Sequence, residues 1–119
     1  MLYSEYKTTF TTAFVEFNQR LIEARSNFID YEILKDEQIL RTFVIDIFAL
    51  RKIYDKSYES DMHTEFLQPK VEIIYDLVQH NIEDVRNGDS EVCNVVSRLI
   101  EEMFKYCKAI SKPVGTSLN

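Results

Sequence analysis

The sequence predicts an all-α protein, an antiparallel bundle of four helices. Gly and Pro are rare, with 2 of each among 119 residues, so turns are few and the elements between them are long. Apolar residues also recur at alternating spacings of three and four, which is the period of one helical face. Short first and last connections favour antiparallel neighbours. We expect helices at about residues 4–30, 37–56, 69–87 and 90–111.

The first predicted helix has an apolar face that is held over three heptads. Four threonines between residues 8 and 12 favour a strand, but no alternation with period two runs far enough to support one. No Gly or Pro occurs before Leu34, so the helix has room to continue to about that residue. The face consists of Phe10, Phe14, Phe17, Leu21, Ala24 and Phe28.

The second predicted helix is the centre of the chain, because residues 39–54 are apolar on most sides. Such a helix is normally surrounded by other helices. It is too short and too charged to span a membrane, and Asp36 is placed to cap its start. One seam is formed by Leu40, Phe43, Ile47, Leu50 and Tyr54, and the other sides carry Ile39, Val44, Ile45, Phe48 and Ile53.

Two further seams define the third and fourth predicted helices. Pro69 suits the first turn of the third helix, and Asn87-Gly88 supplies a left-handed stop. Asp89 or Ser90 then caps the fourth helix, and residues 1–112 form one domain with a short tail at 113–119. The seams are Val71, Tyr75, Val78, Ile82 and Val85, then Val92, Val96, Leu99, Met103, Tyr106 and Ile110.

Composition excludes some classes of function. A net charge of −6 argues against binding nucleic acid by neutralising phosphates. It is compatible with a basic protein partner, and it is also the charge that solubility alone requires. Cys93 and Cys107 lie on one predicted helix, roughly 21 Å apart at about 1.5 Å per residue, too far to form a disulfide with each other. Free thiols and the lack of a signal-peptide pattern predict a cytoplasmic protein.

No arrangement of residues in the sequence predicts catalysis, a cofactor or a metal site. The only histidines are His63 and His80, and neither follows a carboxylate at the spacing of a di-iron bundle. The two cysteines also lack partners at zinc-ligand spacing. His80 lies off its seam and is expected to be a surface residue, and Cys107 is expected to be a small core residue.

Asp46 is the one ionisable residue that the pattern places among apolar neighbours. Its carboxylate either pairs with a basic residue of another helix, such as Arg20, Arg25 or Arg98, or faces a functional opening. We favour structural pairing. The second option leaves open a small enzyme or ligand carrier with a cavity inside the bundle near Asp46.

The remaining class is a non-enzymatic protein–protein interaction module. It would act on a macromolecular partner either as an inhibitor or immunity-type protein or as an assembly subunit. The surplus of apolar helix surface predicts a homodimer.

Residues 55–68 form the longest predicted connection, and long connections in compact helical domains are often functional. Aromatic and Met anchors between carboxylates suit a partner's pocket and its basic rim. Alternatively, Met62, Phe66 and Leu67 form a helical turn that covers one end of the bundle. The predicted partner-binding residues are Asp55, Tyr58, Glu59, Asp61, Met62, Glu65 and Phe66.

Overall fold

Every regular element in the part of the chain that the structure describes is an α-helix. The structure is a computed structural model that describes residues 2–56 and 63–111, with side chains described over 13–54 and 63–110. The all-α prediction is confirmed, while the predicted tail at 113–119 lies outside the described residues. The helices are α1 (Leu2–Leu34), α2 (Glu37–Lys56), α3 (Thr64–His80), α4 (Ile82–Arg86) and α5 (Ser90–Ser111).

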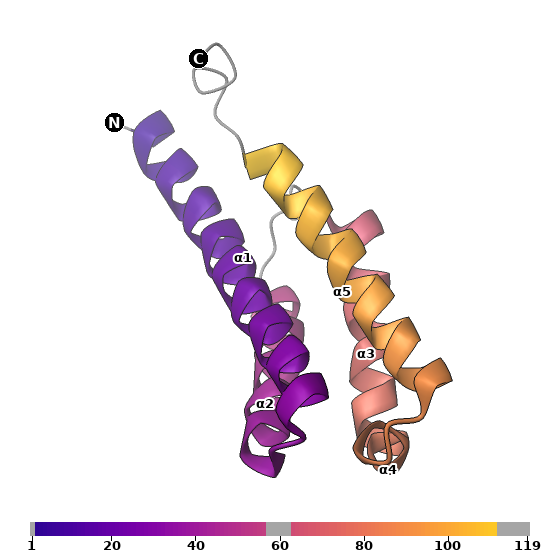
Figure 1. Cartoon of the computed structure of the whole chain (residues 1–119). Helices are drawn as coiled ribbons and strands as arrows, with labels where there is room; N and C mark the ends of the chain where they lie inside the picture. Colours follow the sequence, from indigo (N-terminus) through magenta and orange to yellow (C-terminus); the bar gives the residue numbers. More distant parts are fainter. Residues whose placement is uncertain (1, 57–62, 112–119) are drawn as a thin grey trace.

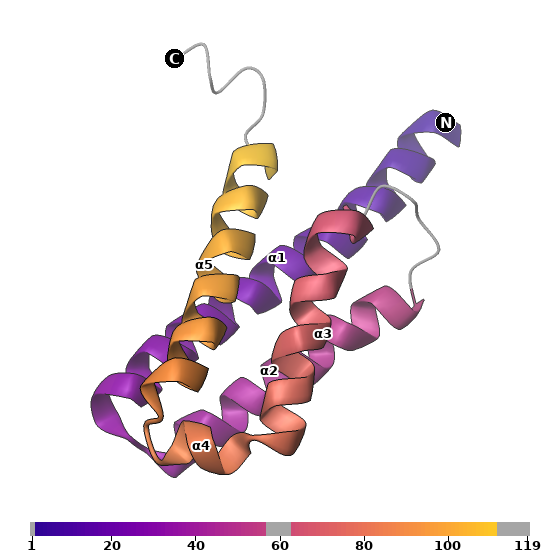
Figure 2. The same ribbon diagram turned by 90° about the vertical axis from the view of Figure 1, so that its right-hand side faces the viewer.

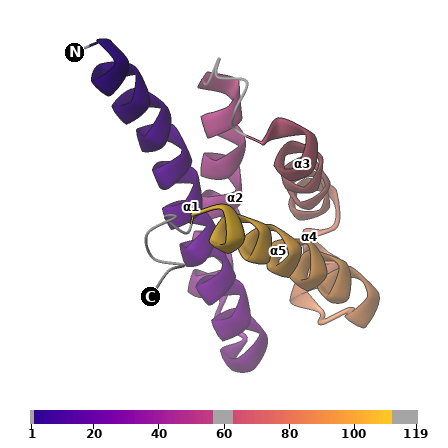
Figure 3. The ribbon, with the colours of Figure 1, turned by 90° about the horizontal axis from the view of Figure 1, so that it is seen from above.

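The four long helices enclose one shared core. α1 packs against α2 and α5, and α3 packs against the same two helices. The direction of the chain reverses from each long helix to the next, and α4 forms a short corner between α3 and α5 (Figures 1 and 2). From above, α2 lies between α1 and α3 (Figure 3). Within the described residues, none of these helices combines the length and apolar character needed to cross a bilayer.

The core is built largely from the seams that the sequence predicts. On α3, however, Ile74 is fully buried where the predicted seam has the half-buried Tyr75, and Ile110 of the predicted fourth seam is 39 % exposed. The side chains of Phe17, Leu21, Phe43, Ile47, Leu50, Ile74 and Met103 are fully buried. The rings of Phe28 and Phe43 join α1 to α2 with centroids 4.9 Å apart. Such interlocked apolar side chains supply most of the stability of a helical bundle.

Local capping chemistry fixes the helix ends. Asp36 caps α2, because its Oδ1 accepts a hydrogen bond of 2.8 Å from the backbone N–H of Gln38. Gly88 has a φ of 72° and provides the predicted left-handed turn before α5. Asp89 then caps α5 through a 3.1 Å bond from the N–H of Val92 to its Oδ1. The caps predicted from the sequence are thus present.

The third predicted helix differs from the structure at its start and in its continuity. α3 begins at Thr64, so Pro69 lies inside the helix and not in its first turn. Near the other end, Asn81 has a φ of −127° and separates α3 from α4. Its N–H donates to the carbonyl of Leu77, while its own carbonyl accepts from Asp84 and Val85. Asn81 therefore closes one helix and starts the next, at a position where the apolar spacing gives no warning of a break.

α2 is less covered than its sequence predicts. It contacts α1 and α3, but within the described residues it makes no close backbone contact with α5. On its outer side, Ile45 and Phe48 are 62 % and 37 % exposed. The prediction that helices surround α2 on most sides is therefore wrong for this face, because the ring of four helices leaves each member an outer side.

Candidate interaction surface

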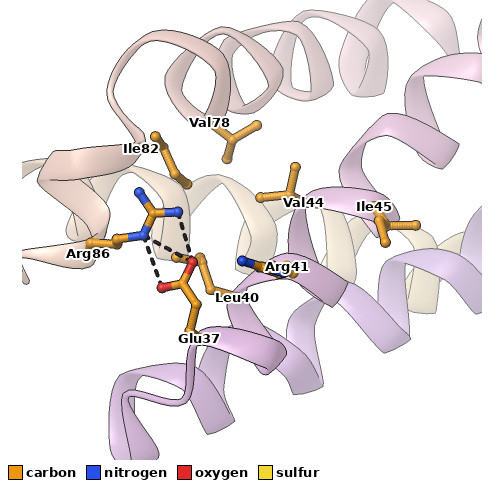
Figure 4. A pocket seen from close by; sticks show the side chains of 8 residues that line it. All are labelled: Glu37, Leu40, Arg41, Val44, Ile45, Val78, Ile82 and Arg86. Atoms are coloured by element: carbon orange, nitrogen blue, oxygen red, sulfur yellow. Dashed lines mark hydrogen bonds and ion pairs between the residues drawn. The ribbon is translucent and has the colours of Figure 1, made fainter.

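An apolar groove opens between α2 and the corner formed by α3 and α4. Its volume is about 380 Å³. Figure 4 shows Val44 from α2 and Val78 and Ile82 from the α3–α4 corner around the opening. The complete lining is Glu37, Leu40, Arg41, Val44, Ile45, Val78, Ile82 and Arg86.

An ion pair closes one end of this groove. The Nε and Nη2 atoms of Arg86 lie 2.9 Å and 2.8 Å from the carboxylate oxygens of Glu37 (Figure 4). Arg86 also binds Glu83 within α4. The hydrogen bond from Arg86 lowers the pKa of the Glu37 carboxyl below its usual range. This pair ties α4 to the first turn of α2, but it is solvent-exposed, so it contributes little to stability.

Apolar surface continues from the groove along α2. Ile45 is largely exposed, and the ring of Phe48 lies 5.0 Å from the ring of Tyr75. Beyond them, Arg51 covers Tyr75 at 4.3 Å and binds Glu72 at 2.9 Å. We use the name groove face for the groove together with the stripe Arg41, Ile45, Phe48 and Lys52.

Besides the paired Arg86, the groove face carries two cations, Arg41 and Lys52. Arg41 and Lys52 are exposed, and neither forms an ion pair with another described residue. An apolar strip with free cations at its ends can bind an apolar surface that carries carboxylates. The sequence indicates this apolar strip, because residues 39–54 carry apolar side chains on an additional side of the helix, but we expected that side to be buried.

Most of the predicted site at 55–66 lies outside the described residues. This holds for Tyr58, Glu59, Asp61 and Met62, and the side chain of Asp55 is also not described. Glu65 and Phe66 belong to the first turn of α3, where Glu65 is exposed and Phe66 is half-buried.

The ring of Phe66 has structural contacts on both faces. It stacks on Tyr106 with centroids 4.1 Å apart and an interplanar angle of 13°, and the Lys70 Nζ lies 3.8 Å from its centre. Leu67, the next residue, is fully buried. These contacts favour the interpretation of this turn as a cover over one end of the bundle.

His63 joins the same end of the bundle and was not singled out from the sequence. It has a φ of 54°, and its Nδ1 lies 2.8 Å from the Tyr106 hydroxyl. Phe14 lies beside it with ring centroids 5.8 Å apart. A second cavity of about 340 Å³ is lined by His63, Thr64, Glu65, Phe66 and Tyr106.

Asp46 is paired structurally, as predicted. It is 1 % exposed, and its Oδ1 accepts a 3.2 Å hydrogen bond from Arg20 while its Oδ2 accepts one of 2.7 Å from Asn27. Both partners lie on α1, so the carboxylate joins α1 to α2. Neither of the two cavities described above is lined by Asp46.

The two thiols and His80 also lie where the sequence predicts. Cys93 and Cys107 are free and buried in α5, and His80 is exposed. Burial raises the pKa of Cys107 to about 12 and shifts that of Cys93 in the same direction. Neither thiol therefore forms a reactive thiolate near neutral pH. Among the described residues, no three side chains of the metal-ligating types lie close enough together to hold an ion.

Comparison with known proteins gives no match to a family model, to a curated protein or to a solved structure.

Proposed function

We propose that this protein is a non-enzymatic protein–protein interaction module that binds its partner through the groove face. The observation that carries the proposal is the exposure of Ile45 and Phe48 beside an apolar groove. Uncovered apolar side chains that continue into a concave surface are typical of protein-binding sites. A partner would place apolar side chains in the groove and carboxylates near Arg41 and Lys52.

Two modes of action fit such a module. As an inhibitor or immunity-type protein, it would block a macromolecular partner, and its net charge of −6 would favour a basic one. As an assembly subunit, it would bind further copies of itself, and the simplest product is a homodimer. The positive charges of the groove face support the assembly mode, because they suit an acidic surface. The free thiols support the cytoplasm as the place of action.

A ligand carrier is the second candidate. A volume of about 380 Å³ is within the range of small-molecule sites. Against it, the exposed apolar surface continues along α2 beyond the groove, which is more than a small ligand needs. An enzyme that uses Asp46 is less well supported, because both carboxylate oxygens already accept hydrogen bonds.

Affinity purification from the native host tests the proposal. We expect a stoichiometric partner, or a second copy, to be recovered by the wild-type chain and lost with Ile45→Glu. The matched control is Ile73→Glu on α3, since Ile73 is 46 % exposed but does not line the groove. Equal recovery by both variants, or no stoichiometric partner for any of the three proteins, would reject the groove face as a binding surface.

A further inference from the structure

The outward side of α1 carries a second apolar stripe. The core seam of this helix is formed by Phe17, Leu21, Ala24 and Phe28, all of them buried. On the opposite side, the exposed positions 15, 19, 22, 26, 29 and 33 repeat the four-three spacing of a helix-packing seam. Its apolar members are Val15, Ile22, Ile29 and Ile33, which are 42 %, 47 %, 39 % and 74 % exposed. α1 is therefore apolar on two sides, and the described chain covers only the side that carries the core seam.

An acidic column runs along one edge of this stripe. Glu16, Glu23 and Asp30 are seven residues apart, so they lie above one another on the helix, and all three are exposed. Glu23 lies 3.5 Å from the Nη1 of Arg20. Glu16 and Asp30 form no ion pair with another described residue. The stripe is thus apolar with a negative edge.

The groove face of α2 has the opposite charge. Arg41, Ile45, Phe48 and Lys52 follow one another at spacings of four, three and four, which places two exposed apolar side chains between two exposed cations. The chain therefore has two uncovered apolar faces of complementary charge, on different helices.

We propose that the outer stripe of α1 in one copy of this chain packs on the groove face of a second copy, head to tail. Ile22 and Ile29 would contact Ile45 and Phe48, while the acidic column would face Arg41 and Lys52. Like-charge contacts disfavour the two symmetric alternatives, because α1 on α1 places acid against acid and α2 on α2 places base against base. This inference rests on the proposed function and deepens it by naming the partner.

A head-to-tail contact has a consequence that a symmetric dimer does not have. Two different faces meet, so each pair leaves one free face of each kind, and further copies add until a ring closes or an open chain grows. Salt weakens the contact, because its charged groups are exposed.

Mixing two variants tests the arrangement. Ile22→Glu disables the face of α1, and Ile45→Glu disables that of α2. Each places a carboxylate in a contact that needs apolar surface, and we expect the dissociation constant to rise at least about tenfold. Both positions are exposed, so thermal unfolding midpoints should match the wild type at a concentration at which the wild type is monomeric. Mass is measured by light scattering or sedimentation between about 1 and 300 μM, a range that covers dissociation constants of ordinary assemblies.

The expected result has three parts. At the concentrations where the wild-type mass first rises above that of the monomer, each variant alone stays monomeric, and their equimolar mixture forms a dimer and nothing larger. A dimer formed by either variant alone would show that the contact is symmetric and not head to tail. A monomeric wild type over the whole range would overturn the inference. If the wild type is monomeric but its host partner is lost with Ile45→Glu, the head-to-tail inference is wrong and the proposed function stands.

Discussion

At the scale of single residues, Asp46 shows how one buried charge can position two helices. Its two oxygens accept hydrogen bonds from Arg20 and Asn27, which lie about two turns apart on α1. The sequence predicted a structural pair and named Arg20 among three candidates. It could not select among them, because the choice depends on how α1 and α2 are rotated about their axes.

Replacing this carboxylate should destabilise the fold moderately. Asp46→Asn keeps the shape but leaves one acceptor oxygen for two donors, and we expect a loss of about 1–3 kcal/mol in the free energy of unfolding. The loss stays below that of a fully buried pair because Arg20 is 39 % exposed and can be hydrated.

Urea unfolding of Asp46→Asn beside the wild type gives this difference. Asp76→Asn serves as the control, since Asp76 is exposed on α3, and it should change the free energy by less than about 0.5 kcal/mol. Equal stability of Asp46→Asn and the wild type would mean that the pair does not hold α1 against α2.

At the scale of helices, α2 has two sides with opposite properties within three residues. Ile47 is fully buried, and Ile45 is 62 % exposed. Ile47→Ala should cost about 2–5 kcal/mol because it leaves a cavity in the core. Ile45→Ala should cost less than about 0.5 kcal/mol, because its side chain is largely exposed.

Urea unfolding at about 1 μM, below the dissociation constants of ordinary weak assemblies, measures both variants of α2 without association. A cost below about 1 kcal/mol for Ile47→Ala would mean that the buried side of α2 has been wrongly assigned.

The elements that the sequence predicted well are those with a local chemical signal. Asp36 and Gly88 mark ends of helices through a side-chain cap and a left-handed backbone, and both features are readable from the residue types. Asn81 breaks the third helix without a comparable signal, since Val78, Ile82 and Val85 keep the helical period across it. The break is recognised only from the backbone hydrogen bonds of Asn81, which end α3 and start α4.

The exposure of one face of α2 could not be predicted from the sequence for a related reason. The apolar pattern of Ile45 and Phe48 is visible in the sequence, but burial is decided by which helices are neighbours. Sequence periodicity predicts that a helix packs, and it does not specify how many sides are covered. The predicted site near Tyr58 remains a prediction, because that residue lies outside the described part of the chain.

At the scale of the whole molecule, two uncovered faces of opposite charge make the bundle suited to association. A thiol introduced by Ile45→Cys reports directly on whether the groove face becomes covered. The native thiols do not interfere, because Cys93 and Cys107 are only 5 % and 0 % exposed and burial raises the pKa of both. Ile73→Cys on α3 provides an exposed control outside the groove.

The decisive measurement is the rate of alkylation of this thiol in a trace amount of the Ile45→Cys protein, without and with excess wild-type chain. We expect the wild-type chain to slow the reaction at position 45 at least about threefold at concentrations above the dissociation constant, because most groove faces are then covered. The rate at position 73 should not change. Equal rates at position 45 with and without the wild-type chain would contradict association through the groove face.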